Sequence, residues 1–75
     1  MELELYETYV TRDGLRLVHI SSIDDYEAYG EYIFEDGTDG NSLWSPFTGR
    51  FLLNSTQENH PYDLVMTEEE WFNNG

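Results

Sequence analysis

The stretch between residues 29 and 53 constrains the fold most, because three short apolar runs in it are separated by two turns that contain glycine. Two Asp-Gly pairs lie between residues 36 and 40, and Phe-Thr-Gly-Arg occupies residues 47–50. Asp-Gly pairs and short glycine-bearing segments are typical of connections between antiparallel strands. The stretch therefore predicts a β-meander on which the rest of the chain packs.

Alternating apolar and polar side chains predict two more strands before this meander. Residues 3–10 alternate, with a change of phase near Tyr6 that indicates either a bulge or a strand covered on both faces. Residues 15–21 follow an Arg-Asp-Gly turn and are apolar on both sides. They predict a central strand whose partner is the first strand.

Two segments depart from the strand pattern. Residues 21–28 lose the alternation and carry three acids, which predicts a surface loop or one helical turn capped by Ser22 or Asp24. Residues 67–70 read Thr-Glu-Glu-Glu, a capping box with threonine at the N-cap and glutamate three residues later. They predict a short C-terminal helix over about residues 68–73.

Together these patterns predict one mainly β domain over residues 1–75, a small antiparallel sheet or partly open barrel of about five strands with a short C-terminal helix. The predicted strands are 3–10, 15–21, 29–35, 42–45 and 50–54, with 63–66 as a closing segment. Aromatic residues make up 16% of the chain and supply core area that a small domain needs. The predicted core is Ile33, Phe34, Leu17, Val18, Trp44, Phe51, Leu53 and Leu64. Positive φ angles are predicted at Gly14, at Gly37 or Gly40, and at Gly49.

Charge excludes several classes of function. The chain has 16 acidic residues, three arginines and no lysine, a formal net charge of −13. Nucleic acids and anionic membranes are polyanions that bind through Lys and Arg, so neither is expected as a direct partner. The sequence contains neither a long apolar run nor a basic-then-apolar leader, which predicts a soluble cytoplasmic protein.

Few residues are candidates for catalysis or metal binding. The chain has no cysteine, so it offers no thiol nucleophile or thiolate metal site. His19 lies in a strand pattern and His60 in a polar loop, each without an evident partner. Residues 35–41 resemble a calcium loop in composition. Counted from Asp36, however, position 5 of the loop is Gly40 and position 12 is Phe47, so two of the required ligands are missing. We therefore expect a protein that is not an enzyme and holds no cofactor or metal.

Carboxylates are the candidate binding groups. On a small sheet, neighbouring strands and alternate residues can array carboxylates at spacings comparable to those of duplex phosphates. Such an array would occupy a basic protein surface in place of DNA. The candidate residues are Glu2, Glu4, Glu7, Asp24, Asp25, Glu27, Glu31, Glu35, Asp36 and Asp39. The alternative is a passive protein-binding or assembly module that uses exposed aromatics such as Tyr26, Tyr29 and Trp71.

A series of short motifs resembles that of small acidic phage and prophage proteins. The motifs are Arg-Asp-Gly at residues 12–14, Asp-Gly at 36–37, Trp44, Gly-Arg-Phe at 49–51 and Asp-Leu-Val-Met at 63–66. The resemblance covers about residues 9–66, and the group has no assigned function. It implies a protein of the host cell cytoplasm that inhibits a host DNA-acting or defence protein. Self-association as a homodimer is left open.

Overall fold

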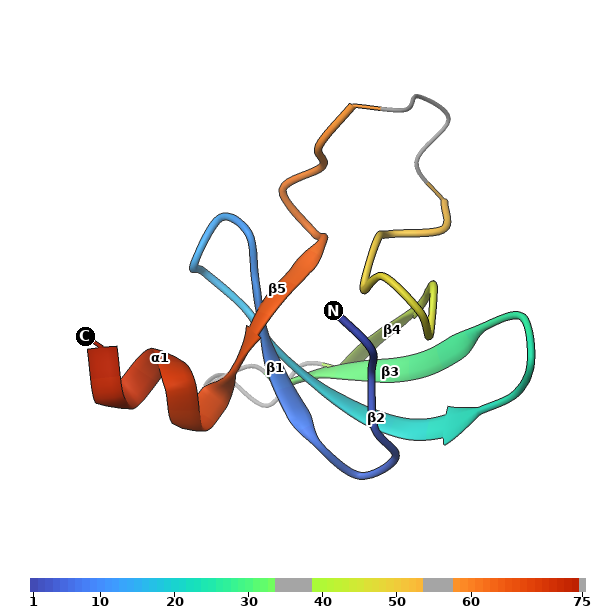
Figure 1. Ribbon diagram of the computed structural model, residues 1–75, viewed down its shortest axis with the longest axis horizontal. Coiled ribbons are helices and arrows are strands. Elements are labelled where there is room, and N and C mark those ends of the chain that lie inside the picture. The colour runs from blue at the N-terminus through green and yellow to red at the C-terminus, as the bar shows by residue number, and fades with distance from the viewer. Residues whose placement is uncertain (34–38, 54–57, 75) are drawn as a thin grey trace.

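The computed structural model describes residues 1–33, 39–53 and 58–74 (Figure 1). These residues form five strands and one helix, which confirms the predicted mainly β fold with a short C-terminal helix. In chain order the elements are β1 (Thr8–Thr11), β2 (Leu17–Ile23), β3 (Ala28–Ile33), β4 (Asp39–Trp44), β5 (Leu64–Thr67) and α1 (Glu68–Asn74).

The strands form one antiparallel sheet in the order β4-β3-β2-β1-β5. The predicted central position of the second strand and its pairing with the first are confirmed. β5 comes last in the chain but pairs with β1, and Figure 1 shows it crossing beside that strand before α1 begins. The amide of Leu64, at the start of β5, donates a 2.8 Å hydrogen bond to the Gly49 carbonyl in the turn after β4. This bond ties together the two ends of an otherwise open sheet.

The core lies on one face of the sheet, where residues that pair between neighbouring strands bring their apolar side chains together. Val18 pairs with Tyr9 on one side and with Tyr32 on the other. Gly30 makes room for the tryptophan above the sheet, because a Cβ at Gly30 would lie 2.9 Å from the Trp44 ring and 2.6 Å from Val18. The buried apolar cluster consists of Leu3, Tyr9, Val18, Ile20, Ala28, Trp44 and Leu64.

Aromatic side chains extend this core toward the loop before β5. The indole Nε1 of Trp44, which is fully buried, donates a 2.8 Å hydrogen bond to the carbonyl of Tyr62. Its ring contacts those of Tyr32 and Phe51, at centroid distances of 5.7 and 5.9 Å. The Tyr62 ring meets both of these rings edge to face. Because tryptophan buries its polar atom only when that atom finds an acceptor, the Tyr62 carbonyl fixes the orientation of the indole.

The first strand is shorter than predicted. Residues 3–7 lie outside β1, and Tyr6 adopts a left-handed conformation, with φ of 67°, where the alternation changes phase. Tyr6 and Glu7 still bond to Ile20 of β2 through the Tyr6 amide at 2.8 Å and the Glu7 carbonyl at 3.0 Å, which fits the predicted bulge. Leu3 nevertheless enters the core, held by a 2.8 Å bond from its amide to the Pro46 carbonyl. The hydroxyl of Tyr9 accepts a further bond from the Glu4 amide. The alternation thus belongs to a segment, residues 2–7, that covers the core and buries one side chain, that of Leu3. This segment is called the covering segment below.

The predicted strand over residues 50–54 is wrong. Its described part forms only a short bridge to the end of β4, where Phe51 pairs with Trp44 between the bonds Ser45 N–H to Arg50 carbonyl and Leu52 N–H to Leu43 carbonyl, and it then turns. On the side away from β4, the Phe51 amide donates a 2.8 Å hydrogen bond to the buried carboxylate of Asp63 instead of to a further strand, and the His60 amide donates a second bond to this carboxylate at 2.9 Å. It also faces Arg12 at 3.4 Å. The fifth strand is instead β5, which corresponds to residues 63–66, predicted only as a short closing segment.

Other boundaries shift by a few residues. The predicted loop over 21–28 shrinks to a tight turn, because β2 continues to Ile23 and β3 begins at Ala28. Asp24 does cap that turn, its carboxylate accepting bonds from the amides of Tyr26 and Glu27 at 2.7 Å. The strand predicted over 42–45 spans 39–44, and the parts of the predicted strand 29–35 beyond Ile33 lie outside the described residues.

Positive φ angles occur at Gly14 and Gly49, as predicted. Gly40 instead lies within β4 and is not among the glycines with positive φ, and Gly37 lies outside the described residues.

Three of the eight predicted core residues are fully buried, namely Val18, Trp44 and Leu64. Leu17 and Phe51 are half-buried, and Phe34 lies outside the described residues. Ile33 and Leu53 are exposed by 49% and 65%, so their prediction as core residues is wrong. Ile33 points to the outer face of the sheet, and Leu53 follows the turn that replaces the predicted strand.

The capping box predicted for the helix is confirmed. The hydroxyl of Thr67 accepts a bond from the Glu70 amide at 3.1 Å, and the Glu70 carboxylate accepts one from the Thr67 amide at 3.2 Å. The resulting α1 has seven residues and packs against β1 and β5. Within the described part of the chain, no helix has the length and apolar character needed to span a membrane.

We expect Thr67→Ala to lower the free energy of unfolding by about 1 kcal/mol, because it removes the side-chain acceptor at the N-cap. Urea denaturation followed by circular dichroism measures the change. Thr67→Ser keeps the hydroxyl and is expected to retain most of the stability. A Thr67→Ser variant as unstable as Thr67→Ala would contradict a capping role.

Candidate functional site

The predicted acidic residues lie on three separate parts of the described structure. Glu2 and Glu4 are exposed on the covering segment before β1, and Glu7 is half-buried next to them. Asp24, Asp25 and Glu27 are exposed in the β2–β3 turn, and Glu31 is exposed in β3. Asp39 begins β4, whereas Glu35 and Asp36 lie outside the described residues. The described acids are therefore found mainly in a turn and a covering segment, with Glu31 and Asp39 in the strands β3 and β4.

The turn between β2 and β3 holds one of its carboxylates in a defined position. Hydrogen bonds from the amides of Tyr26 and Glu27 stabilise the ionised form of Asp24 and hold its pKa below the usual range. Asp25 and Glu27 flank an exposed tyrosine in the same turn. The turn thus carries three exposed acidic residues and one exposed tyrosine at an end of the sheet.

A second acidic region forms around the hydroxyl of Tyr9. Burial raises the pKa of this phenol, and the nearby negative charges of Glu4, Glu7 and Glu70 add to the rise. Glu70 comes from α1 and was not predicted as a binding residue, although the run of three glutamates is evident in the sequence. Its proximity to the N-terminal acids follows from the pairing of β1 with β5, which the sequence pattern did not predict.

The three arginines have contacts within the chain. Arg12 faces the buried Asp63, and Arg16 contacts Asp13 at 3.1 Å and lies 4.5 Å above the Tyr62 ring. Arg50 donates a bond to the carbonyl of Glu58. The three guanidinium groups thus lie near the Arg-Asp-Gly turn and the loop before β5. The acids of the β2–β3 turn and of the covering segment form no ion pair among the described residues.

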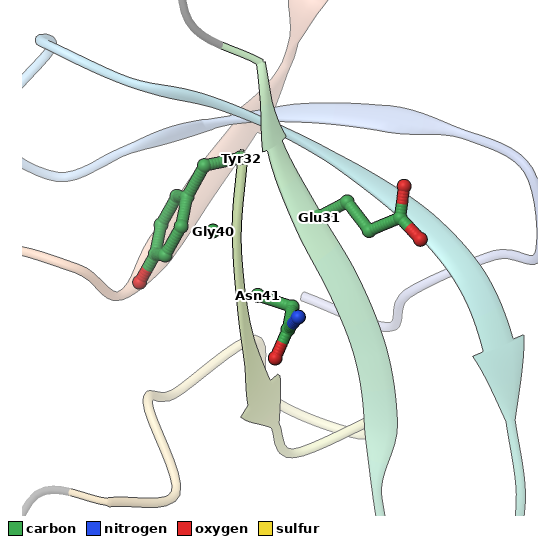
Figure 2. Close-up of a pocket in the computed structure, with 4 residues that line it drawn as sticks. All are labelled: Glu31, Tyr32, Gly40 and Asn41. Carbon is green, nitrogen blue, oxygen red and sulfur yellow. The ribbon is translucent and has the colours of Figure 1, made fainter. Parts of the chain in front are cut away.

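A small hollow of about 250 Å³ lies between β3 and β4, lined by Glu31, Tyr32, Gly40 and Asn41. Figure 2 shows the side chains of Glu31 and Tyr32 leaving β3 in opposite directions. The carboxylate and the phenol therefore do not converge on one point, as an acid–base pair would have to. Among residues 1–33, 39–53 and 58–74, no three histidine or acidic side chains come together as metal ligands.

The two histidines occupy different surroundings. His19 lies in β2, where its Nδ1 is 3.2 Å from the Thr8 hydroxyl and its ring stacks on Tyr6. His60 stacks on Phe51, and its Nδ1 accepts a bond from the Tyr62 amide. Both rings thus take part in local packing, and each Nδ1 has a partner, the Thr8 hydroxyl for His19 and the Tyr62 amide for His60.

Comparisons with protein families, with curated proteins and with solved structures found no match to this chain.

Proposed function

We propose that this protein is a binding protein whose carboxylates occupy the basic, DNA-contacting surface of another protein in place of phosphates. A phage-encoded chain of this kind would act in the host cytoplasm, as an inhibitor of a host DNA-acting or defence protein. The proposal follows from electrostatic complementarity, in which a strongly acidic surface steers toward a basic cleft and fixes its orientation there.

The observation that carries the proposal is the distribution of charge. The formal net charge is −13, while the three arginines make their contacts around the Arg-Asp-Gly turn and the loop before β5. Most carboxylates of the β2–β3 turn and the covering segment are exposed, and that of Asp24 is held in place by two backbone hydrogen bonds. Charges that are already ordered cost less conformational entropy on binding.

The experiment is a pull-down from a bacterial lysate at low and high salt, followed by competition between duplex DNA and this protein for the recovered partner. Recognition through charge predicts at least a tenfold loss of affinity between about 0.05 and 0.5 M salt, since the Debye length falls from above 10 Å to below 5 Å. DNA is expected to displace the protein. A partner that binds both at once without loss of affinity would rule out mimicry.

One pair of variants separates charge from shape at the β2–β3 turn. The triple variant Asp24→Asn, Asp25→Asn, Glu27→Gln removes three charges and keeps an acceptor for the turn amides. Tyr26→Ala removes the exposed ring between these residues and keeps the charge. Under mimicry the triple variant binds at least tenfold more weakly and Tyr26→Ala binds normally.

The second candidate function is a passive binding module that uses exposed aromatic residues. Tyr26, which is 84% exposed, favours it. In this case Tyr26→Ala weakens binding and the triple charge variant does not, so the same two measurements decide between the candidates.

A further inference from the structure

An apolar groove lies beside α1 on the outer face of the sheet. It encloses about 700 Å³, and its apolar lining consists of Val10, Leu15, Leu17, Ile33, Trp71 and Phe72. Leu15, Ile33 and Phe72 are exposed by 80%, 49% and 64%. Exposed apolar side chains that gather in one groove, instead of scattering singly, mark interaction sites on soluble proteins.

The floor of the groove follows from the strand register. Val10 pairs with Leu17, and Leu17 pairs with Ile33, so one row of apolar side chains crosses β1, β2 and β3 on the outer face. The helix packs on β1 and β5, which buries Val10 and leaves the β2–β3 end of the row open. Trp71 and Phe72 form the wall on the helix side.

Acidic residues border this groove. Glu68 precedes Trp71 and Phe72 by three and four residues, so it shares their face of the helix. Glu69 and Glu70 follow Glu68 in the first turn of α1 and are exposed. α1 carries three acids in its first turn and no basic residue in its last. Arg16 also lines the groove, but its guanidinium contacts Asp13 and the Tyr62 ring.

We propose that the groove binds an amphipathic, positively charged segment of a partner protein. Apolar side chains of the segment would fill the groove, and its lysines or arginines would face the bordering carboxylates. A second copy of this chain fits poorly, because it would bring a further charge of −13 against the first. The inference does not depend on DNA mimicry, since it concerns another surface and an apolar contact.

The probe is a synthetic helical peptide of leucine and lysine whose leucines lie along one face. Its matched control has the same composition in a scrambled order, which keeps the charge and disperses the apolar face. Binding to the full chain is followed by tryptophan fluorescence, to which Trp71 in the groove responds while Trp44 stays fully buried. We expect at least tenfold tighter binding of the amphipathic peptide, persisting at 0.5 M salt, roughly the point where exposed charges are strongly screened.

Two phenylalanine variants provide the structural control. Phe72→Ala removes a groove residue, whereas Phe47→Ala removes a phenylalanine of nearly equal exposure, 65%, in the turn after β4. Thermal unfolding verifies that both variants fold, and Leu15→Ser gives a second groove variant with little effect on packing. We expect Phe72→Ala and Leu15→Ser to weaken peptide binding at least tenfold and Phe47→Ala to leave it unchanged.

Three results would overturn the inference. The first is equal binding of both peptides or of all three variants, which would mean that charge alone holds the peptide. The second is no binding of either peptide. The third is a dimer of the unmodified chain in sedimentation that Phe72→Ala converts to a monomer, which would make a second copy the occupant. DNA competition with a recovered partner is unaffected by each of these results, so the two proposals fail separately.

Discussion

Replacing Gly49 with alanine is expected to lower the free energy of unfolding by about 3 kcal/mol, a large part of the stability of a domain this small. Gly49 has φ of +76°, which L-residues rarely adopt. In addition, a Cβ at this position would lie 2.7 Å from the Leu64 carbonyl oxygen. The Gly49 carbonyl also accepts the hydrogen bond from the Leu64 amide that ties β5 to the turn after β4. Chemical denaturation measures the loss.

Gly14→Ala is the matched control. Gly14 has a similar φ of +72°, but a Cβ there would meet nothing within 4 Å. Its replacement therefore carries only the backbone cost, about 1 kcal/mol. Thr48→Val, at the exposed neighbour of Gly49, is expected to change stability by less than either. Equal losses for the two glycine variants would show that the contact with Leu64 is unimportant.

Asp63→Ala is expected to destabilise the protein by about 3 kcal/mol, because it leaves buried amide donors without an acceptor. The carboxylate is 1% exposed and accepts bonds from the amides of Phe51 and His60, besides facing Arg12. These contacts hold together the loop before β5, the segment after β4 and the Arg-Asp-Gly turn. Urea unfolding of the variant and the parent measures the difference.

The same carboxylate makes stability depend on pH. Burial opposes its ionisation, but the amides of His60 and Phe51 and the charge of Arg12 outweigh burial, so the pKa of Asp63 lies below its ordinary value. A lowered folded-state pKa stabilises the protein above the unfolded pKa of about 3.9, and this stabilisation disappears as pH falls through the folded value. The parent protein should therefore be more stable than the Asp63→Asn variant at neutral pH, and this difference in the free energy of unfolding should disappear below about pH 4. Parallel stability curves for the two proteins in acid would refute this assignment.

The sequence predicted the fold class because turn residues and alternation act locally. Gly14 and Gly49 have the positive φ that their turns require, and Thr67 with Glu70 caps the helix as expected. The errors lie where a distant residue decides the structure. Residues 50–53 have the composition of a strand, yet they turn after one bridge to β4, and the Phe51 amide donates to Asp63, twelve residues later. Local propensity contains no information about such a competitor.

The candidate site was predictable in composition but not in arrangement. Net charge predicted carboxylates as candidate binding groups, and the exposure of Asp24, Asp25 and Glu27 follows from their turn. The approach of Glu70 to Glu4 and Glu7 depends on the pairing of strands from opposite ends of the sequence. The groove beside α1 likewise combines Ile33, predicted as core, with Trp71 of the helix.

The position of β5 also determines how the chain reaches its native state. The pairings from β1 to β4 join strands that follow one another in sequence, whereas β5 pairs with β1 from almost the other end of the chain. Closing a longer loop costs more entropy, and folding slows as contacts become more distant in sequence. The hairpins can therefore form early, while Leu64 and the Asp63 contacts join the core only when the largest loop closes. We therefore expect the docking of β5 to be the slow step of folding, with the inner face of the sheet open to water before it.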